Sequence, residues 1–536
     1  LLLGLLLFGL LVWWFYDVVG VSGVVTWLGY GVFPSFSFIL DEVSLVCLYM
    51  LLCCGFVALF YCYHYFGGGS DGLLLFPLVV WFLGVMCFLV LTSSMLFSLV
   101  FWEYLGLVSF FLILFYSNMS SLRASLITLF ASRFGDVSMF VIIMWLSWCW
   151  DLSSLLFVLL FLLVVMTKSA CYPFVSWLLE AMRAPTPVSS LVHSSTLVAA
   201  GVWFVLRYSY IGGVDAMYWL GGFCLVTIML TSFAALVFMD LKKIVALSTC
   251  NNVSWCILFF IFGDLSLSLL QLVSHGVCKC YLFMSVGDLM GQSGSSQSSV
   301  GVFLGRYSGN FLPILHGFLV LSLCGLPFIG VFFSKHLLFS GLLYSLGSGF
   351  VMLFLFCLIL SYVYSFRFVM LLLGSMGGLS SGYSSFFFII CPLVMLGTIL
   401  NYLGGMFILE DVAMCSFFSF LVLILQVLGC LGGYFFYFYL MGVGRWSSGL
   451  SGCEGYVSSF YYSFVLFSSI CVVSFYRWEV FLLGLLSKFS FRSWLLHESF
   501  FSLNFLIMGL FFVFMFSFIL YGGSCVFIMG GGCFIY

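Results

Sequence analysis

Six charged side chains occur inside long apolar runs of this sequence, where charge is expected to be costly. At the centre of a membrane-spanning helix, a charged residue costs roughly 2.5–3.5 kcal/mol on insertion scales. Charges kept there usually mark a polar path for ions or protons. A simpler alternative is that each is half of a buried ion pair joining two helices. The six residues are Glu103, Arg133, Asp136, Lys168, Lys279 and Lys335.

The spacing of two pairs places them on common helix faces. Arg133 and Asp136 are three residues apart, so they share a face and could form an ion pair. His275 and Lys279 are four residues apart and also share a face. Because both side chains can hold or release a proton in a suitable environment, this second pair could act as a proton relay.

Glu103 and Lys168 lie in different apolar runs and carry opposite charges. We predict that they approach each other across the helix bundle, directly or through one water, with Arg133 as a competitor for the carboxylate. Two other basic residues, Arg207 and Arg367, are expected to reach water from helix ends by snorkelling.

Proline residues accompany two of the lysines. Lys168 precedes Pro173 in KSACYP, and Lys335 follows Pro327 in GLPFIGVFFSK. Both segments therefore resemble spans interrupted at mid-membrane, one in each half of the chain. Paired interrupted helices indicate a transporter built from inverted repeats, with its site at the interruptions. A plain proline kink is the alternative for either segment.

The composition places these residues in a membrane. The chain is 65% hydrophobic and only 6% charged, against about 25% charged residues in soluble domains. This excludes a soluble globular protein and a disordered one. Fifteen basic residues nearly balance seventeen acidic ones, so a nucleic-acid-binding stripe is also excluded. The apolar runs are continuous and do not alternate as membrane β-strands do, so helices are expected.

We therefore predict an all-α polytopic membrane protein with about fourteen to sixteen transmembrane helices. The predicted architecture has two inverted repeats, each with a broken helix. Its parts are N-terminal transmembrane helices with a loop at 1–94, a translocating core at 95–373 with repeats at about 95–208 and 218–373, and C-terminal helices at 374–536. The first run, 1–16, has no basic n-region and is expected to be a true span. Residues 18–38 are rich in Gly and are expected to form an ordered loop.

Loop charges predict the orientation. Basic residues gather on the side where synthesis occurs. One set of alternate loops carries Arg123, Arg183, Lys242, Lys243 and Arg306. The opposite loops carry Asp151, Asp215, Asp264 and Arg207. The first set is expected to face the cytoplasm, or the matrix in a mitochondrion.

The twenty-one cysteines are scattered through the apolar runs and include no CxxC pattern. We interpret them as small hydrophobic residues, so no metal site is expected.

Six runs resemble, in order, the motifs of one known family. They are FWEYLGLVSFFLI at 101–113, SRFGD at 132–136, KSACYPFVSWLLEAMRAPTPVSSLVHSSTLVAAG at 168–201, DLKKIVALST at 240–249, SHGVCKCYLF at 274–283 and GLPFIGVFFSK at 325–335. The family is the antiporter-like membrane subunits of respiratory NADH:ubiquinone oxidoreductase. The resemblance is strong from about 41 to 335 and weaker elsewhere. APTPVSSLVHSST at 184–196 distinguishes the chain from the sibling subunits 2 and 4, which share the lysines but not this run.

The resemblance implies roles for nine residues. Glu103 matches the glutamate that pairs with the first key lysine, and Lys168 matches that lysine on a broken helix. His275 and Lys279 match the central histidine and lysine, and Lys335 matches the terminal lysine on the second broken helix. The remaining matches are Arg133 and Asp136, a pair near the first channel; His193, a histidine between two half-channels; and Asp240, an acidic residue opening a helix on the matrix side.

The sequence also departs from the family pattern. Gln271 stands where the family usually has a second histidine, and His336 stands where it often has aspartate. Because glutamine cannot change charge, a relay that needs two histidines is in doubt. Residues 485–500 resemble a short or degenerate form of the family's lateral helix, or else an ordinary interfacial amphipathic segment.

The resemblance implies a proton-translocating membrane-arm subunit in the mitochondrial inner membrane, driven by a switch in the pairing of Glu103 and Lys168. No cofactor is expected in this chain; NADH, FMN, iron–sulfur clusters and ubiquinone are expected in partner subunits. The implied partners are other membrane-arm subunits, especially the antiporter-like subunits 4 and 2, and the lipid bilayer, with no nucleic acid. The alternative is a subunit of a multisubunit sodium/proton antiporter without a redox partner. A purely structural spacer is disfavoured by the buried charges.

Overall fold

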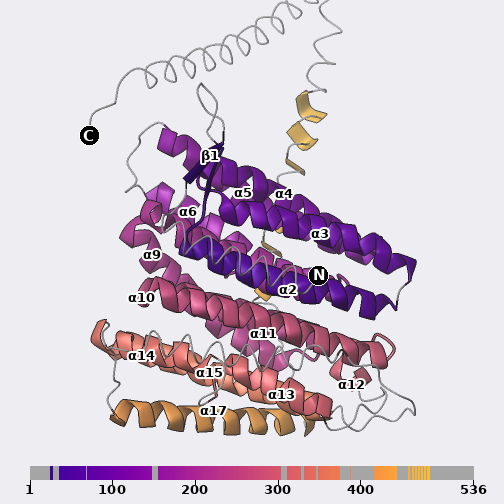
Figure 1. The fold of residues 1–536 in the computed structure, drawn as a ribbon, viewed down its shortest axis with the longest axis vertical. Coiled ribbons are helices and arrows are strands. Elements are labelled where there is room, and N and C mark those ends of the chain that lie inside the picture. The colour runs from indigo at the N-terminus through magenta and orange to yellow at the C-terminus, as the bar shows by residue number, and fades with distance from the viewer. Residues whose placement is uncertain are drawn as a thin grey trace, which may run out of the picture. The chain divides into compact units, whose positions relative to one another are not determined.

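The computed structural model describes residues 24–27, 36–67, 69–147, 155–302, 311–326, 331–345, 348–374, 387, 416–442 and scattered positions between 457 and 482. The chain divides into two units, Leu1–Tyr461 and Tyr462–Tyr536. The described residues of the second unit are helical. Every helix discussed below belongs to the first unit (Figure 1).

The first unit is built almost entirely from helices. Lipid offers no hydrogen-bond partners, so the backbone of each apolar run must satisfy itself internally. Among the described residues, nine helical segments are long and apolar enough to cross a membrane. The all-α polytopic prediction is therefore confirmed. The longer helices are α2 (Glu42–Phe66), α3 (Ser70–Leu91), α4 (Met95–Leu114), α5 (Met119–Ser147), α9 (Leu197–Val237), α10 (Leu241–Phe262), α11 (Leu265–Gln292), α15 (Ser348–Gly374) and α17 (Ser416–Gly442).

Shorter helices fill the space between them. They are α6 (Leu155–Lys168), α7 (Ser176–Ala181), α8 (Thr186–Leu191), a π-helical turn η1 (Val192–Thr196), α12 (Ser299–Val302), α13 (Phe311–Cys324) and α14 (Phe332–Ser345). Helix α10 packs against both α9 and α11, while α11 also contacts α2 and α13 (Figure 1). Helices α10 and α11 are therefore the most enclosed spans of the described structure.

The run Thr186–Val237 contains two membrane crossings. Its 52 helical residues would extend about 78 Å as one helix, far more than the ~30 Å hydrocarbon core. Non-helical backbone angles at Tyr208 and Gly213 interrupt it, and Gly213 has a φ of 66°. This turn separates the two spans expected at 188–208 and 218–239.

Both interruptions expected near the lysines occur. Helix α6 ends at Lys168 and α7 begins only at Ser176. Helix α13 ends at Cys324, Gly325 takes a φ of 86°, and α14 begins at Phe332. Pro327 itself lies outside the described residues.

Part of the N-terminal segment expected to be a loop is a β-hairpin. Strand β1 (Val24–Trp27) pairs antiparallel with β2 (Phe36–Ile39), in a register that places Val24 opposite Ile39. Ser and Phe alternate strictly at 35–38, which is the two-residue period of a strand, so the sequence contained a signal for β2.

The two arginines expected to snorkel are held by protein groups. Arg207 forms an ion pair with Asp41 at the start of α2. Arg367 is fully buried, and its guanidinium donates to the carbonyls of Ala235 at 2.9 Å and Phe238 at 3.2 Å. For Arg367 the snorkelling prediction is wrong, because the free carbonyls at the end of α9 satisfy its charge inside the protein.

Several expected elements fall outside the described residues. They include the first span at 1–16, the lateral helix at 485–500 and most of the C-terminal helices expected at 374–536. The boundaries at 94 and 373 stay predictions.

Candidate functional site

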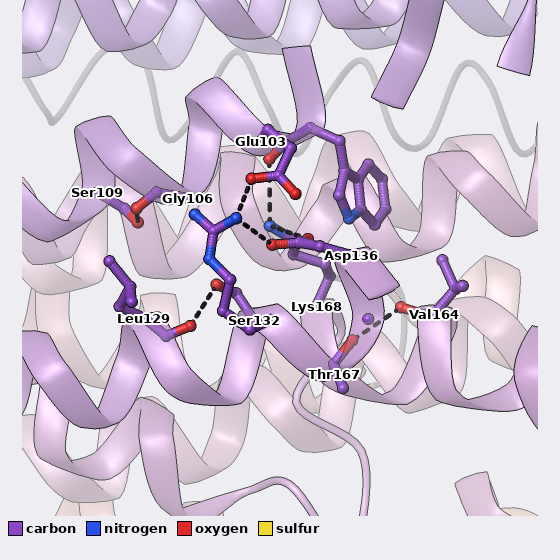
Figure 2. A network of polar contacts seen from close by, with 12 residues as sticks. Glu103, Gly106, Ser109, Leu129, Ser132, Asp136, Val164, Thr167 and Lys168 are labelled. Carbon is purple, nitrogen blue, oxygen red and sulfur yellow. Dashed lines mark hydrogen bonds and ion pairs between the residues drawn. The ribbon is translucent and has the colours of Figure 1, made fainter. Parts of the chain in front are cut away.

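Three neighbouring helices bring four charged side chains together. Glu103 comes from α4, Arg133 and Asp136 come from α5, and Lys168 is the last residue of α6 (Figure 2). Arg133 forms an ion pair with Glu103, and its Nη1 lies 3.5 Å from Asp136 Oδ2. Lys168 Nζ lies 3.7 Å from Asp136 Oδ1. The four groups form a continuous chain of alternating charge.

We predicted that Glu103 approaches Lys168 directly or through one water, and the structure shows no direct ion pair between them among the described residues. Among the described residues, Glu103 forms its ion pair with the competitor Arg133, and Lys168 forms its ion pair with Asp136. A guanidinium has five donors in a planar fork, so Arg133 can bridge two carboxylates. The compact ammonium of a lysine is less suited to this role. Glu103 and Lys168 are thus coupled through two intermediate groups. The predicted pairing of Arg133 with Asp136 is confirmed.

Burial divides the cluster into an inner and an outer half. The side chains of Lys168 and Asp136 are each 1% exposed, whereas that of Glu103 is 40% exposed. Glu103 and Arg133 therefore lie at the lateral surface of this chain, and Asp136 connects them to the interior. Of the four residues predicted to face the bundle interior, Lys168, Lys279 and Lys335 are buried and Glu103 is not.

The broken helix positions Lys168. Its Nζ lies 3.4 Å from the Trp102 carbonyl and 5.1 Å from the centre of the Trp102 ring. Beyond the break, Trp177 Nε1 donates to the carbonyl of Thr167 at 2.9 Å. The indole thereby satisfies a carbonyl that the ended helix leaves free, and it ties α7 to the end of α6.

His193 and Lys168 both line a small cavity. The cavity is lined by Ser109, Ser132, Thr167, Trp177 and other residues, and it has room for about one water. His193 is fully buried on the π-helical turn, and neither ring nitrogen finds a hydrogen-bond partner among the described residues. A single water could therefore join the lysine and the histidine.

Lys242 is a buried cation that sequence reasoning treated only as a topology marker. Its Nζ donates to the carbonyl of Ala184 at 3.2 Å, and its charge is near enough to act on His193. Its neighbour Lys243 instead forms a half-exposed ion pair with Asp240 at 3.1 Å. The sequence indicated that one of the two lysines would be buried, because two consecutive residues of a helix do not share a face and so cannot both point outward.

The central lysine, Lys279, bridges two enclosed helices. Its Nζ hydrogen-bonds the hydroxyl of Ser248 on α10. His275 lies one turn earlier on α11 and is buried, and its Nε2 has no hydrogen-bond partner among the described residues. The predicted shared face is confirmed, and no carboxylate forms an ion pair with Lys279 in the described residues.

The terminal lysine, Lys335, lies in the first turn of α14, directly after the second interruption. Lys335 Nζ donates to the carbonyl of Cys324, the last residue of α13, at 2.7 Å. It also lies over the rings of Trp255 and Tyr362, at 5.7 and 5.9 Å. The carbonyl end of a helix carries partial negative charge, so the helix itself supplies the counter-charge.

The two departures from the family pattern lie beside this lysine. The Oε1 of Gln271 accepts a hydrogen bond from Ser334 at 2.7 Å, which ties α11 to α14 next to Lys335. The ring of His336 lies 5.4 Å from that of Phe332. Gln271 thus holds a position in the row of polar groups without being able to carry charge.

Comparisons with known proteins agree on the family. Residues 92–361 match the family described as "NADH:quinone oxidoreductase/Mrp antiporter, TM". A protein of Locusta migratoria named NADH-ubiquinone oxidoreductase chain 5 is 34% identical over 66% of this chain and 64% of its own length. The protein of that name from Mytilus edulis is 37% identical over 57% of this chain and 56% of its own length. The matched part therefore spans about three-fifths of these relatives.

Two solved structures share the fold. The Mrp complex from Dietzia sp. DQ12-45-1b matches with a TM-score of 0.69 at 22% identity, covering 89% of this chain and 58% of that chain. An archaeal membrane-bound sulfane sulfur reductase matches with a TM-score of 0.63 at 17% identity, covering 81% of this chain and 92% of that chain. At these identities the likeness shows the fold alone.

Proposed function

The chain belongs to the NADH:quinone oxidoreductase/Mrp antiporter membrane family, and from this we propose that it is a proton-translocating membrane-arm subunit of a respiratory NADH:ubiquinone oxidoreductase. The observation that carries the proposal is the series of fully buried lysines, Lys168, Lys279 and Lys335, each held by neutral or weakly polar groups or by one carboxylate. Buried lysines can change protonation state, and their position inside the bundle supports a path for protons.

Movement of Arg133 would drive the first step. When Arg133 shifts toward Glu103, Asp136 is left free to hold Lys168 in its charged form. When Arg133 shifts toward Asp136, it neutralises that carboxylate, and Lys168 can release a proton toward the cavity and His193. The switch therefore operates through an arginine between two carboxylates, and Glu103 acts at a distance.

The later steps would use the central and terminal lysines. Ser248 is a neutral partner that can both accept and donate, so it lets Lys279 exist with or without its extra proton. His275 would assist as a neutral relay. Lys335 would exchange its proton last, because the helix-end carbonyl stabilises its charged form without a carboxylate.

The rest of the reaction would occur in partner subunits. We propose that NADH, FMN, iron–sulfur clusters and ubiquinone bind there, and that this chain contacts the antiporter-like subunits 4 and 2 in the mitochondrial inner membrane. The curated relatives named above are all chains of NADH-ubiquinone oxidoreductase, which supports a redox complex.

A second candidate is a subunit of a sodium/proton antiporter without redox partners. The fold match to the Mrp complex favours it, and the family description covers both classes. It is the weaker candidate because that match is 22% identical, whereas the chain 5 relatives reach 34–37%.

Capture of the chain from its native membrane in mild detergent tests the proposal. We expect redox subunits to accompany it, and we expect the reconstituted complex to move protons on addition of NADH and a quinone in sodium-free buffer. A preparation that lacks redox subunits and exchanges sodium for protons would overturn the proposal and establish the antiporter.

A further inference from the structure

A carboxylate–histidine pair lies away from the lysine series, near the ends of α2 and α11. His64 Nε2 lies 3.4 Å from Asp288 Oδ1. The other carboxylate oxygen accepts a hydrogen bond from the backbone N–H of Phe387 at 3.0 Å. His64 is 26% exposed and Asp288 is 4% exposed, so the pair reaches from the surface into the protein.

Two hydroxyl groups lie behind this pair. Tyr61 is one turn before His64 on α2, and its side chain interacts with both Asp288 and Thr186. Both hydroxyls are fully buried, and neither completes a well-formed hydrogen bond within the described part of the chain. Gly287 leaves room for them, because a Cβ at that position would meet the Tyr61 oxygen and the Thr186 side chain.

The chain itself places Thr186 close in sequence to the candidate proton path. Thr186 opens α8 and lies two residues after Ala184, whose carbonyl holds Lys242. His193 lies seven residues beyond Thr186, about 10 Å along the helix. Printed contacts thus reach from His64 at the surface to Thr186, and Thr186 lies in the sequence between Ala184, which holds Lys242, and the buried His193.

All of these groups lie at one end of the bundle. Asp288 is near the end of α11, His64 is near the end of α2, and Lys242 is in the first turn of α10. This end carries the basic loop residue Arg183, which contacts the Ser120 carbonyl at the start of α5. We call it the basic side of the bundle.

We propose that His64, Asp288, Tyr61 and Thr186 form a proton-uptake site on the basic side, which supplies Lys242 and His193. The inference rests on the proposed function and adds the point where protons are taken up. A proton from water binds His64, and its N–H bond breaks as an O–H bond forms on Asp288. Asp288 then protonates the Tyr61 oxygen while Tyr61 passes its own proton to Thr186, and Thr186 passes one on to a neutral Lys242. Each bond formed balances one broken, and no electron is transferred.

The test uses Asp288→Asn in the assembled respiratory complex. Asparagine keeps the shape of the side chain and an acceptor for the Phe387 N–H, but it cannot carry a proton. We expect the complex to assemble and proton uptake to fall about a hundredfold, the contribution typical of a positioned acid–base group. Added formate, a small diffusible acid, should restore much of the rate.

The matched control is Asp71→Asn. It makes the same change at an exposed residue at the start of α3 on the basic side, and it should take up protons at the rate of the unsubstituted chain.

Three outcomes would overturn the uptake site. Normal proton uptake by Asp288→Asn would mean that Asp288 only binds the backbone N–H of Phe387 to α11 and carries no proton. A slow variant that formate does not restore would assign Asp288 a structural role. If Asp288→Asn fails to assemble, the His64→Gln variant provides the test. Because His64 is partly exposed, this variant should assemble, take up protons slowly and respond to formate. A His64→Gln complex with normal uptake would also overturn the proposal.

Lys279→Ala, measured in parallel, separates this inference from the proposed function. Loss of proton uptake in Lys279→Ala beside normal uptake in Asp288→Asn would refute the uptake site alone. Normal uptake in both would refute the proposed function itself.

Discussion

At the scale of single residues, an arginine between two carboxylates organises the first charge cluster. Arg133 bonds to Glu103 and lies 3.5 Å from Asp136, so a small movement of its guanidinium changes which carboxylate it neutralises. Lys168 is buried beside Asp136 and responds to that change directly. Asp136 is therefore the group through which the outer pair acts on the lysine.

Asp136→Asn is expected to impair proton uptake more than Glu103→Gln. The first change removes the only carboxylate that forms an ion pair with Lys168 among the described residues, and a buried charge left unpaired is strongly unfavourable. The second leaves Arg133 wholly on Asp136 and changes the lysine only indirectly. We expect uptake to fall roughly a hundredfold in the first variant and less in the second, measured by NADH-driven acidification in vesicles. Equal losses, or a larger loss in Glu103→Gln, would contradict this order.

Two neighbouring lysines provide a matched comparison. Lys242→Ala should slow proton uptake markedly, because the buried ammonium lies on the route between Ala184 and His193. Lys243→Ala should have little effect, because half-exposed ion pairs such as that with Asp240 contribute only about 0–1 kcal/mol. Both variants are compared by the initial rate of NADH-driven proton uptake. Similar rates in the two would show that burial of Lys242 serves packing and not transport.

At the scale of elements, the broken helices leave carbonyl groups free to bind side chains. The end of α13 contacts Lys335 through Cys324, and the end of α6 is closed by Trp177. An unbroken helix would have used these carbonyls in its own hydrogen bonds. The interruptions therefore create polar sites inside an apolar bundle.

The first interruption depends on close packing with α9. A Cβ added at Gly201 would lie 2.8 Å from the backbone nitrogen of Ser169 and 2.9 Å from its Cβ. Gly201→Ala should therefore displace the segment that follows Lys168 and destabilise the protein by about 1–3 kcal/mol. The control is Gly222→Ala on the same helix, where a Cβ meets nothing within 4 Å. Thermal unfolding of the purified complex, followed by loss of activity, should show a lower Tm for Gly201→Ala only.

At the scale of the whole molecule, the charges at helix ends predict its orientation. Lys243 and Asp264 flank opposite ends of α10. In a cysteine-labelling experiment with a membrane-impermeant maleimide, Lys243→Cys should react from the side that carries the basic loops and Asp264→Cys from the opposite side. The unsubstituted chain controls for the native cysteines. Labelling of both variants from one side would contradict the assignment.

The inverted repeat is a second prediction at this scale. Superposition of residues 95–208 on 218–373, with one inverted, should bring Lys168 near Lys335. Both lysines already lie at interrupted helices, α6–α7 and α13–α14. An experimental structure of the complex provides the measurement, and failure of the two halves to superpose would remove the repeat.

The sequence by itself determined the class of protein and the positions of its chemistry. Long apolar runs can only be helices in lipid, and the cost of a buried charge drew attention to Lys168, Lys279 and Lys335 as candidate site residues. Pro173 near Lys168 and Pro327 near Lys335 predicted both interruptions, because proline disrupts a helix locally. These properties depend on composition and short-range spacing, which the sequence contains in full.

Only the tertiary structure decided which charges pair. Whether Glu103 meets Arg133 or Lys168 depends on how α4, α5 and α6 are rotated against one another, and helices of uniformly apolar sequence carry little information about rotation. The same reason explains the burial of Lys242 and Arg367, and the meeting of His64 with Asp288, which are more than two hundred residues apart. Packing between distant segments selects such pairs, because each requires one particular arrangement of the helices that carry it.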